Sequence, residues 1–555
     1  MLSELISRIE ALIPGPTYSP ADLEQKYPIR NLPAGAMVTR IAPSPTGFMH
    51  IGTVYMALVN ERLAHQSSGI FYLRIEDTDK KREVQGATGL IVNCLQRYGM
   101  RVDEGEVAQD VEVGNYGPYK QSERANIYKS YIIDLLRQGK AYPCFCTPEE
   151  LKDQHDMQEL QKIRTGYYGR FAKWRDASEE SVREQLAANT PFTIRFRSEG
   201  SESGRIAFED ALKGHRELPE NDQDIVVMKT EGLPTYHFAH VVDDHLMRTT
   251  HVLRGDEWFA SVPLHLQLFQ TMGWQAPTYG HVMPINKMEG SSKRKLSKRK
   301  DPEANVAYYD EQGYPVPAVI EYLLNLANSD FEDWRKANPT VDAREFQLTF
   351  QKLQNSNGAL FDFTKMDDVS KEWIAKSSID EFFAEAVAWT TMYDAELTDR
   401  MQSDIAYTKK IIGIERHDPA TVRKDVAKWS DLRHEMGYFF DDFFTAESAH
   451  LSESLVKTME KKEAQRVVAA FLETYQIEDT KEEWIAKIRT VCRELGYAET
   501  AKEFKLKPES FAGSIANVTG VLRILLTGRT FSPDLYEVMR VMGIERLRQR
   551  LMAIT

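Results

Sequence analysis

The sequence predicts an α/β protein: a Rossmann-type unit with parallel strands, interrupted by a polar insertion and followed by an all-helical C-terminal region. Residues 38–77 carry a strand, helix, strand pattern of about the length that a right-handed parallel crossover requires. Residues 141–223 are polar and lack the apolar runs of a parallel sheet, which indicates an insertion. After about residue 370, apolar residues recur with the period of helices.

The composition is that of a globular protein of several domains, with 555 residues, 42% hydrophobic and 28% charged. The formal net charge of -13 argues against wholesale coating of nucleic acid but allows a local basic groove. Four cysteines are too few for a disulfide framework and indicate a reducing compartment. Because no basic leader or long apolar run is present, we expect a cytoplasmic protein without a membrane partner.

The elements follow from the patterns in order. A helical N-terminal extension (1–36) ends in the turn-rich "NLPAGA". The first half of the Rossmann unit (37–140) has strands at 38–42 and 71–77 around a helix at 51–66. After the insertion (141–230), the second half (231–290) and its approach carry strands at 225–229, 238–242, 251–255 and 279–285, with a helix at 262–272. A basic loop and its continuation (291–370) precede the helical region (371–555).

The stretch "RIAPSPTGFMHIGT" (40–53) joins the first strand to the first helix. The N-terminus of a helix presents unpaired N–H groups and a partial positive charge, so it binds phosphate. Gly52 allows a ligand to approach the backbone, His50 supplies a donor, and Pro43 and Pro45 stiffen the turn. An ordinary strand-to-helix connection would give the same pattern.

The segment "SSKRKLSKRK" (291–300) is a cationic loop with a glycine and serine lead-in. Such a loop suits a triphosphate whose charge must be stabilised while pyrophosphate leaves. A solvated charge run is the usual alternative, and the companion motif at 40–53 favours the phosphate-binding interpretation.

Together the two motifs resemble those of class I aminoacyl-tRNA synthetases, the first as His50-Ile51-Gly52-Thr53 and the second as Lys295-Leu296-Ser297-Lys298-Arg299. The flanking segments look like glutamyl-tRNA synthetase: "LRIEDTD" (73–79), "YKQSER" (119–124), "GLPTYHFAHVVDDHLM" (232–247), "HVLRGDEW" (251–258) and "LRILLTGRTFSPDLYEVMRVMG" (522–543). The glutaminyl branch typically differs at 44–46 and 76–79, so glutamate is the expected amino acid.

The resemblance implies functional residues. The glutamate contacts would be Arg40, Ala42, Ser44, Glu76, Tyr236, Arg254 and His240, the last at a place where relatives often carry Asn. The ATP contacts would be Thr46, His50, Gly52, Glu257, Trp258 and Lys298. Paired guanidinium groups suit the carboxylates of glutamate. His50 and Lys298 are expected to make the main transition-state contacts to phosphate, with Lys295 in support.

The implied reaction has two steps. Glutamate attacks the α-phosphate of ATP, with Mg²⁺ shielding the triphosphate, and the terminal ribose of tRNA(Glu) then takes the glutamyl group. The insertion is expected to bind the acceptor end, residues 291–370 the stem, and residues 371–555 the anticodon. Whether tRNA(Gln) is also charged stays open, and a monomer is the default.

The cysteines at "CFC" (144–146) match the start of a zinc site found in relatives. The comparable later stretch offers Tyr167 but has Phe171 and Lys173 where cysteine and histidine would be wanted, so we expect no metal. The aromatic run "MGYFFDDFF" (436–444) is expected to be helical core rather than a stacking platform for bases.

Three other functions stay open at this point. A tRNA-modifying glutamyl transferase would lack the long helical C-terminus, and an adenylate-forming nucleotidyltransferase acting on small molecules would lack the tRNA-binding parts. A non-catalytic tRNA-binding paralogue would be expected to lose His50 or Lys298, and both are present.

Overall fold

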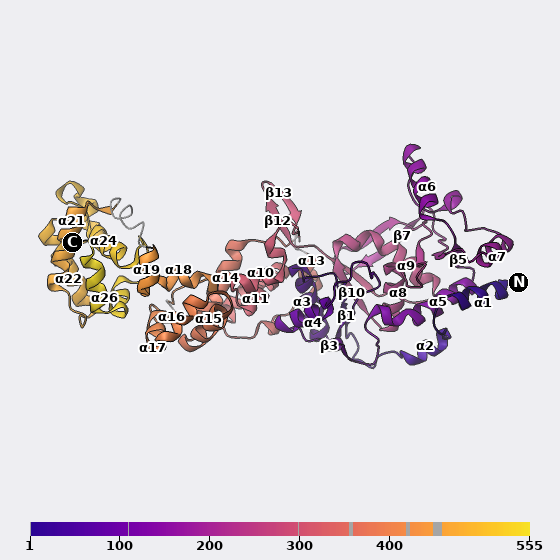
Figure 1. Ribbon diagram of the computed structural model, residues 1–555, viewed down its shortest axis with the longest axis horizontal. Helices are drawn as coiled ribbons and strands as arrows, with labels where there is room; N and C mark the ends of the chain where they lie inside the picture. Colours follow the sequence, from indigo (N-terminus) through magenta and orange to yellow (C-terminus); the bar gives the residue numbers. More distant parts are fainter. Residues whose placement is uncertain are drawn as a thin grey trace. The chain divides into compact units, whose positions relative to one another are not determined.

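The structure, a computed structural model, describes residues 2–108, 110–297, 299–354, 359–417, 422–447 and 458–554. The chain divides into two compact units (Figure 1). Unit 1 comprises residues 1–306 and 320–362, and unit 2 comprises residues 307–319 and 363–555. None of the helices in the described ranges combines the length and the apolar character that crossing a membrane would require.

The N-terminal extension is helical, as predicted, with α1 (Leu2–Leu12) and α2 (Pro20–Lys26). Ser19 caps α2, because its hydroxyl accepts from the N–H of Asp22 while the Asp22 carboxylate accepts from the N–H of Ser19. Ile9 and Leu23 are buried in the same core cluster as the helices of unit 1. The extension is therefore part of the core of this unit.

The first sheet has the order β1-β2-β3-β4: β1 (Val38–Ile41), β2 (Ile70–Leu73), β3 (Glu104–Ala108) and β4 (Val111–Val113). β1 to β3 are parallel, with Arg40 opposite Tyr72. α3 (Ile51–Gln66) crosses over between β1 and β2, as predicted. β2 ends at Leu73, so Glu76 lies in the loop beyond it rather than in a strand.

The second sheet has the order β10-β11-β7-β8: β10 (His251–Gly255), β11 (Thr278–Val282), β7 (Arg205–Asp210) and β8 (Gly214–Pro219). β10 and β11 are parallel. The N–H of Thr250, just before β10, donates to the carbonyl of Val38 (3.0 Å). This hydrogen bond brings the start of β10 beside the start of β1. The helices of this region are α8 (Tyr236–Leu246) and α9 (Val262–Thr271).

One predicted element is wrong: residues 238–242 belong to α8 and form no strand. The insertion is also less separate than its composition indicates, because β7 pairs with β11 through Asp210 and Tyr279. A third sheet, in the order β5-β6-β9, is antiparallel and consists of β5 (Ala141–Cys144), β6 (Thr193–Phe196) and β9 (Val226–Met228).

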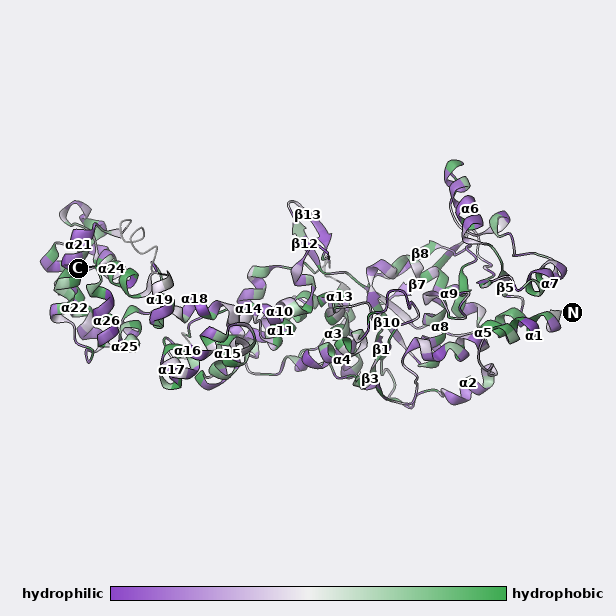
Figure 2. Cartoon of the chain, in the orientation of Figure 1, coloured by the Kyte–Doolittle hydropathy of each residue, from purple (hydrophilic) through white to green (hydrophobic). Residues whose placement is uncertain are grey.

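Further α-helices lie between residues 87 and 354. They are α4 (Ala87–Arg97), α5 (Ala125–Arg137), α6 (Pro148–Leu160), α7 (Glu179–Ala187), α10 (Val306–Gln312), α11 (Val316–Ala327), α12 (Asp330–Ala337) and α13 (Phe350–Gln354). An antiparallel hairpin of β12 (Asn286–Glu289) and β13 (Ser292–Lys295) carries the start of the basic segment, and Figure 2 shows β13 as hydrophilic.

Unit 2 is helical throughout its described residues, as the periodicity after residue 370 predicts. Besides most of α10 and the start of α11, its α-helices are α14 (Phe363–Ala375), α15 (Ile379–Tyr393), α16 (Ala395–Ser403), α17 (Ile405–Ile412), α18 (Leu432–Met436), α19 (Asp441–Glu447), α21 (Lys461–Thr474), α22 (Lys481–Leu495), α23 (Ala501–Leu506), α24 (Ile515–Thr527), α25 (Leu535–Met542) and α26 (Ile544–Met552). Tyr438, Phe439 and Phe440 are buried in its core. The core interpretation of the aromatic run is confirmed for these three residues.

Candidate active site

A pocket of about 750 Å³ opens in unit 1 where the loop after β1, the start of α3, the end of β10 and the end of β13 meet. Its lining includes Arg40, Ala42, Ser44, Thr46, His50, Gly52, Glu76, Tyr236, Arg254, Glu257, Trp258 and Lys295. These are all the sequence-predicted site residues except His240, which does not line the pocket, and Lys298, which lies outside the described residues. Segments separated by up to about 250 residues thus meet at one cavity.

His50 is the residue that caps the N-terminus of α3. Its Nδ1 accepts from the backbone N–H of Gly52 at 2.9 Å, so the neutral ring carries its proton on Nε2. A Cβ at position 52 would lie 2.9 Å from the same Nδ1, which explains why glycine is needed there. The histidine and the helix N-terminus therefore present donors to the same pocket.

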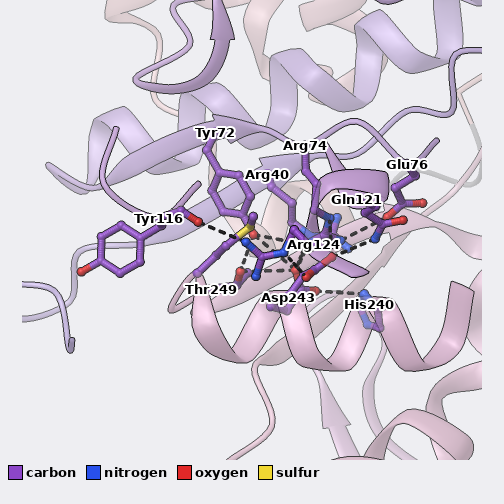
Figure 3. A network of polar contacts seen from close by, with 12 residues as sticks. Arg40, Tyr72, Arg74, Glu76, Tyr116, Gln121, Arg124, His240, Asp243 and Thr249 are labelled. Atoms are coloured by element: carbon purple, nitrogen blue, oxygen red, sulfur yellow. Dashed lines mark hydrogen bonds and ion pairs between the residues drawn. The ribbon is translucent and has the colours of Figure 1, made fainter. Parts of the chain in front are cut away.

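A buried network of charged groups adjoins the pocket, because its members Arg40 and Glu76 also line it; Figure 3 shows the network. Arg74 donates from Nη1 to Asp244 Oδ1 (2.6 Å) and from Nη2 to Glu76 Oε1 (3.1 Å). Arg40 Nε reaches the same oxygen of Asp244 at 3.4 Å. Burial alone would raise the pKa of Asp244, but the two guanidinium groups hold it well below its ordinary value. Asp244 is therefore a fixed negative charge that orients both arginines.

Asp243 anchors a second layer of the network. It accepts from Arg124 Nε (2.6 Å), from Tyr128 OH (2.8 Å) and from Gln121 Nε2 (2.9 Å). The side chains of Arg74, Arg124 and both aspartates are fully buried. Because each buried charge has an opposite partner and hydrogen bonds, the network holds the loop after β2 against α8.

Glu76 and Tyr236 both line the pocket. Burial raises the pKa of Glu76 above its ordinary value, although Arg74 and Arg40 act against this. The ring of Tyr236 packs against Trp258 with ring centroids 4.4 Å apart. Burial also raises the pKa of Tyr236 to about 12, so its hydroxyl stays protonated as a donor.

Arg254 is buried at the end of β10, and its guanidinium is held by neutral groups. Nε donates to His281 Nε2 (3.0 Å), and Nη2 donates to the carbonyl of Trp258 (3.1 Å). No ion pair joins it to an aspartate or glutamate of the described residues, in contrast to Arg40, which pairs with Asp244. This guanidinium can therefore donate hydrogen bonds to a carboxylate of a ligand.

His240 was predicted as a glutamate contact, but the structure places its fully buried side chain behind Tyr236. Nδ1 lies 2.9 Å from Asp244 Oδ2, and Nε2 lies 3.1 Å from Tyr279 OH. Burial lowers its pKa to about 3, so the ring is neutral. With both nitrogens engaged by protein groups, His240 supports the network rather than the pocket wall.

Two cations of the basic segment after residue 291, Arg294 and Lys295, pair with acidic side chains. Arg294 forms a bidentate pair with Asp301 (2.6 and 2.8 Å), and Asp301 also accepts from the N–H of Ser297 (2.8 Å). Lys295 pairs with Glu257 at 2.8 Å, with both side chains about half exposed. Arg294 is therefore a structural residue of the loop, whereas Lys295 faces the pocket.

The two cysteines of "CFC" contact Tyr167 instead of further cysteine or histidine ligands. Cys144 Sγ lies 3.4 Å and Cys146 Sγ lies 3.6 Å from Tyr167 OH. Lys173 pairs with Glu150. Over the described part of the chain, the single group that combines three potential metal ligands is the exposed set His155, Asp156 and Glu159, which lies elsewhere. The expectation of no zinc stays a prediction.

Sequence reasoning gave no role to several residues of the site, although some lie in the quoted segments 73–79 and 232–247. Asp243 and Asp244 were passed over, although an adjacent pair of acidic residues inside an apolar run is a signal of buried charge. Arg74 was missed in the same way. Met283 and Ile285 also line the pocket, and an apolar residue beside a strand end gives no sequence signal of ligand contact.

Known proteins resemble this chain along almost its entire length. Residues 36–368 match a family described as tRNA synthetases class I (E and Q), catalytic domain, and residues 381–555 match an anticodon binding domain. The chain is 48% identical over 527 residues to the glutamate–tRNA ligase of Clostridium perfringens (strain 13 / Type A), which covers 95% of this chain and 96% of that protein. It is 45% identical over 558 residues to the glutamate–tRNA ligase of Sorangium cellulosum, covering 96% and 97%.

A solved structure is similar over the same length. The crystal structure of a glutamate tRNA ligase from Elizabethkingia meningosepticum in complex with its amino acid matches with a TM-score of 0.72. The two sequences are 28% identical, and the match covers 93% of this chain and 99% of that one.

Proposed function

The chain belongs to the class I tRNA synthetases of the E and Q group and to the glutamate–tRNA ligases within it, and from this premise we propose that it joins L-glutamate to tRNA(Glu) in two ATP-dependent steps. The observation that supports this most strongly is the pocket in unit 1. It combines a helix N-terminus with a histidine cap, two arginines and a buried carboxylate.

In the first step, the pocket positions glutamate and ATP for attack of a glutamate carboxylate on the α-phosphate. Arg40 and Arg254 bind the carboxylates of glutamate, while Glu76 faces its ammonium group. Ala42, Ser44 and Tyr236 complete that side of the pocket. Thr46, Gly52, Glu257 and Trp258 face ATP. No protein nucleophile is required, so catalysis consists of positioning and charge stabilisation.

His50 and the basic segment stabilise the charge that develops on the phosphates. Because Nδ1 of His50 accepts from the N–H of Gly52, the ring proton is on Nε2, and we assign to this N–H the contact with a phosphate oxygen. On the assignment made from the motif, Lys295 and Lys298 supply further positive charge to the phosphates. We propose that ATP enters as its magnesium complex, with the ion held by the phosphates. The pocket carboxylates Glu76 and Glu257 are each already paired with a cation, Arg74 and Lys295 respectively, and so are not assigned as magnesium ligands.

In the second step, the terminal ribose hydroxyl of tRNA takes the glutamyl group from the adenylate. We propose that the insertion (141–230) binds the acceptor end, that residues 291–370 contact the stem, and that residues 371–555 bind the anticodon. The match of residues 381–555 to an anticodon binding domain supports the last assignment. It also argues against a tRNA-modifying glutamyl transferase, which would lack this region. We further propose a cytoplasmic monomer.

The test is aminoacylation of purified tRNA(Glu) and tRNA(Gln), side by side, with L-glutamate and ATP. Glutamyl-tRNA(Glu) should form at a rate that depends on all three substrates. The result with tRNA(Gln) decides whether the anticodon region accepts a second tRNA. Formation of a glutamyl adenylate without transfer to either tRNA would favour the nucleotidyltransferase alternative, and no activation at all would favour the non-catalytic paralogue.

A further inference from the structure

The guanidinium of Arg254 is surrounded by imidazole rings. Besides the hydrogen bond to His281 Nε2 (3.0 Å), its Nη1 lies 3.3 Å from His265 Nδ1. The ring of Tyr279 lies beneath it, with 4.9 Å from Cζ to the ring centroid. Arg254 is only 6% exposed. A cation this deeply buried normally has a carboxylate partner, because an uncompensated charge in a protein interior is costly.

The partners of His281 fix its tautomer. Because a guanidinium can only donate, His281 Nε2 must be the acceptor of the bond from Arg254. Its proton is therefore on Nδ1, which donates to Asp210 Oδ2 at 2.5 Å. Burial, assisted by the charge of Arg254, lowers the pKa of His281. The ring is thus neutral and locked in one orientation.

Asp210 is itself held firmly. Its Oδ1 accepts from the backbone N–H groups of Leu212 and Lys213, both at 2.9 Å. Burial alone would raise its pKa, but the hydrogen bonds from His281 and the backbone lower it, so the carboxylate is ionised. The negative charge nearest to this side of Arg254 therefore lies one imidazole ring away from the guanidinium.

His265 repeats the pattern on the other side. Its Nδ1 accepts from Arg254 and its Nε2 lies 3.0 Å from His237 Nδ1. Burial, His240 and Arg254 hold the pKa of His265 well below its ordinary value, and burial and Arg254 lower that of His237 to about 4. His265 is therefore, like His281, a neutral acceptor that orients the guanidinium without cancelling its charge.

We propose that His281, fixed by Asp210, is a positioning residue that orients Arg254 while leaving its positive charge for a carboxylate of the substrate. A carboxylate in direct contact would orient Arg254 equally well but would compete with glutamate. This inference rests on the proposed function, because it takes glutamate as the ligand of Arg254.

The origin of Asp210 extends the inference to the insertion. Asp210 ends β7 and is the residue through which β7 pairs with β11, opposite Tyr279. It therefore comes from the segment (141–230) that we assign to the acceptor end of tRNA. The insertion thus helps to support the amino-acid pocket through Asp210 and His281. A displacement of β7 would therefore change the orientation of Arg254 through these two residues.

The test compares His281→Gln with His281→Glu, two side chains of the same size that differ in charge. The Gln variant keeps a neutral acceptor for Arg254 and loses the bond to Asp210, so the glutamate KM should rise by about tenfold. The Glu variant places a carboxylate on Arg254, and the glutamate KM should rise by about 100-fold or more. The KM for ATP and the kcat should change little in both.

Direct binding of L-glutamate, measured by calorimetry, gives a second readout that does not depend on catalysis. His251→Gln and His251→Glu serve as matched controls, because His251 lies at the start of the neighbouring strand β10 and contacts Thr250 rather than Arg254. If the variants at 281 do not fold, Asp210→Asn is measured instead, with about a tenfold loss of glutamate affinity expected.

Each remaining outcome contradicts one of the two proposals. Equal effects of Gln and Glu at position 281, or an ATP KM that rises as much as the glutamate KM, would reduce His281 to a structural residue. That result would leave the proposed function intact. A wild-type protein that neither binds nor activates glutamate would overturn the proposed function, and this inference with it.

Discussion

At the scale of single residues, Asp244 connects the two sides of the amino-acid pocket. It holds Arg40, proposed to bind a carboxylate of glutamate, and Arg74, which in turn holds Glu76. The carboxylate-binding and ammonium-binding groups thus share one buried anchor. A substitution of Asp244 would therefore change the positions of Arg40 and, through Arg74, of Glu76.

We predict that Asp244→Asn lowers the free energy of unfolding by about 3–5 kcal/mol, because Arg40 and Arg74 lose a buried counter-charge. Urea unfolding at neutral pH measures this. Since the folded pKa of Asp244 is well below its ordinary value, its stabilising contribution is present above about pH 3.9 and is lost as the pH falls through the folded pKa. The exposed pair of Asp176 with Arg197 provides the control Asp176→Asn, and an equal effect of both variants would contradict the prediction.

A second prediction at this scale concerns His65, in the last turn of α3. Its ring contacts Glu61 (3.0 Å) and Asp103 (2.7 Å). Burial alone would lower its pKa, but the bonds to these two carboxylates raise it to about 9. A raised pKa stabilises the fold fully below about pH 6.5 and less as the pH rises through 9.

The stabilisation of wild type over His65→Gln should therefore shrink by about 1–2 kcal/mol between pH 6.5 and 9.5, allowing for solvent screening. Thermal unfolding over this pH range measures it. His155→Gln, at an exposed histidine of α6, serves as the control variant. A difference that is independent of pH would mean that His65 is neutral in the folded protein.

The pocket wall could be predicted from the sequence far better than its support. The motifs of the resemblance include Arg40, His50 and Arg254, and all three line the pocket. His281 and Asp244 act through other side chains, and their contacts join segments far apart in the chain. Only the folded structure reveals such contacts, which explains why His240 was assigned to the substrate although it lies behind Tyr236.

At the scale of elements, α8 shows where pattern reasoning fails. Its sequence "YHFAHVVDDHL" is rich in residues with high strand propensity, and the stretch 238–242 reads as a buried strand. In the structure the residues from Phe238 to Asp244 are all buried, so no polar face reveals the helical period. Its two aspartates can be buried because they pair with arginines on neighbouring elements.

The hairpin of β12 and β13 and the loop after it give a third prediction. Asp301 holds the base of this loop through Arg294 and the N–H of Ser297, and the hydrogen bond from Arg294 lowers its pKa to about 2. Asp301→Asn should loosen the loop and slow formation of the adenylate by about tenfold, with glutamate affinity unchanged.

Rapid-quench measurement of adenylate formation in the presence of tRNA tests this. The control is Glu289→Gln, because Glu289 is the exposed second partner of Arg294. If the Asn variant forms the adenylate as fast as the control, the contacts of Asp301 do not contribute to this step.

At the scale of the whole molecule, residues 2–27 belong to the core of unit 1, although the sequence alone left their role open. α1 contacts α5 and α7, and Arg248 beyond the end of α8 pairs with Glu24 of α2. The extension therefore braces the helix that carries Asp243 and Asp244. Composition could not predict this, because a short amphipathic helix looks the same whether it packs on its own chain or on a partner.

We predict that Ile9→Ala lowers the free energy of unfolding of unit 1 by about 2–5 kcal/mol, the cost of a cavity in a packed core. Ile9 is 1% exposed, whereas Ile29 of the same extension is 86% exposed, so Ile29→Ala is a matched control. Scanning calorimetry of the full chain measures both. Equal melting curves for the two variants would mean that the extension is dispensable for the fold.

The imidazole surroundings of Arg254 have a consequence for fidelity. A buried guanidinium without a counter-ion raises the free energy of the empty pocket, and an arriving carboxylate recovers that energy. Glutamine has nearly the same shape as glutamate, but its neutral amide could not compensate the charge. The protein would thus discriminate against glutamine without a steric clash, because with glutamine bound the buried charge of Arg254 would remain uncompensated.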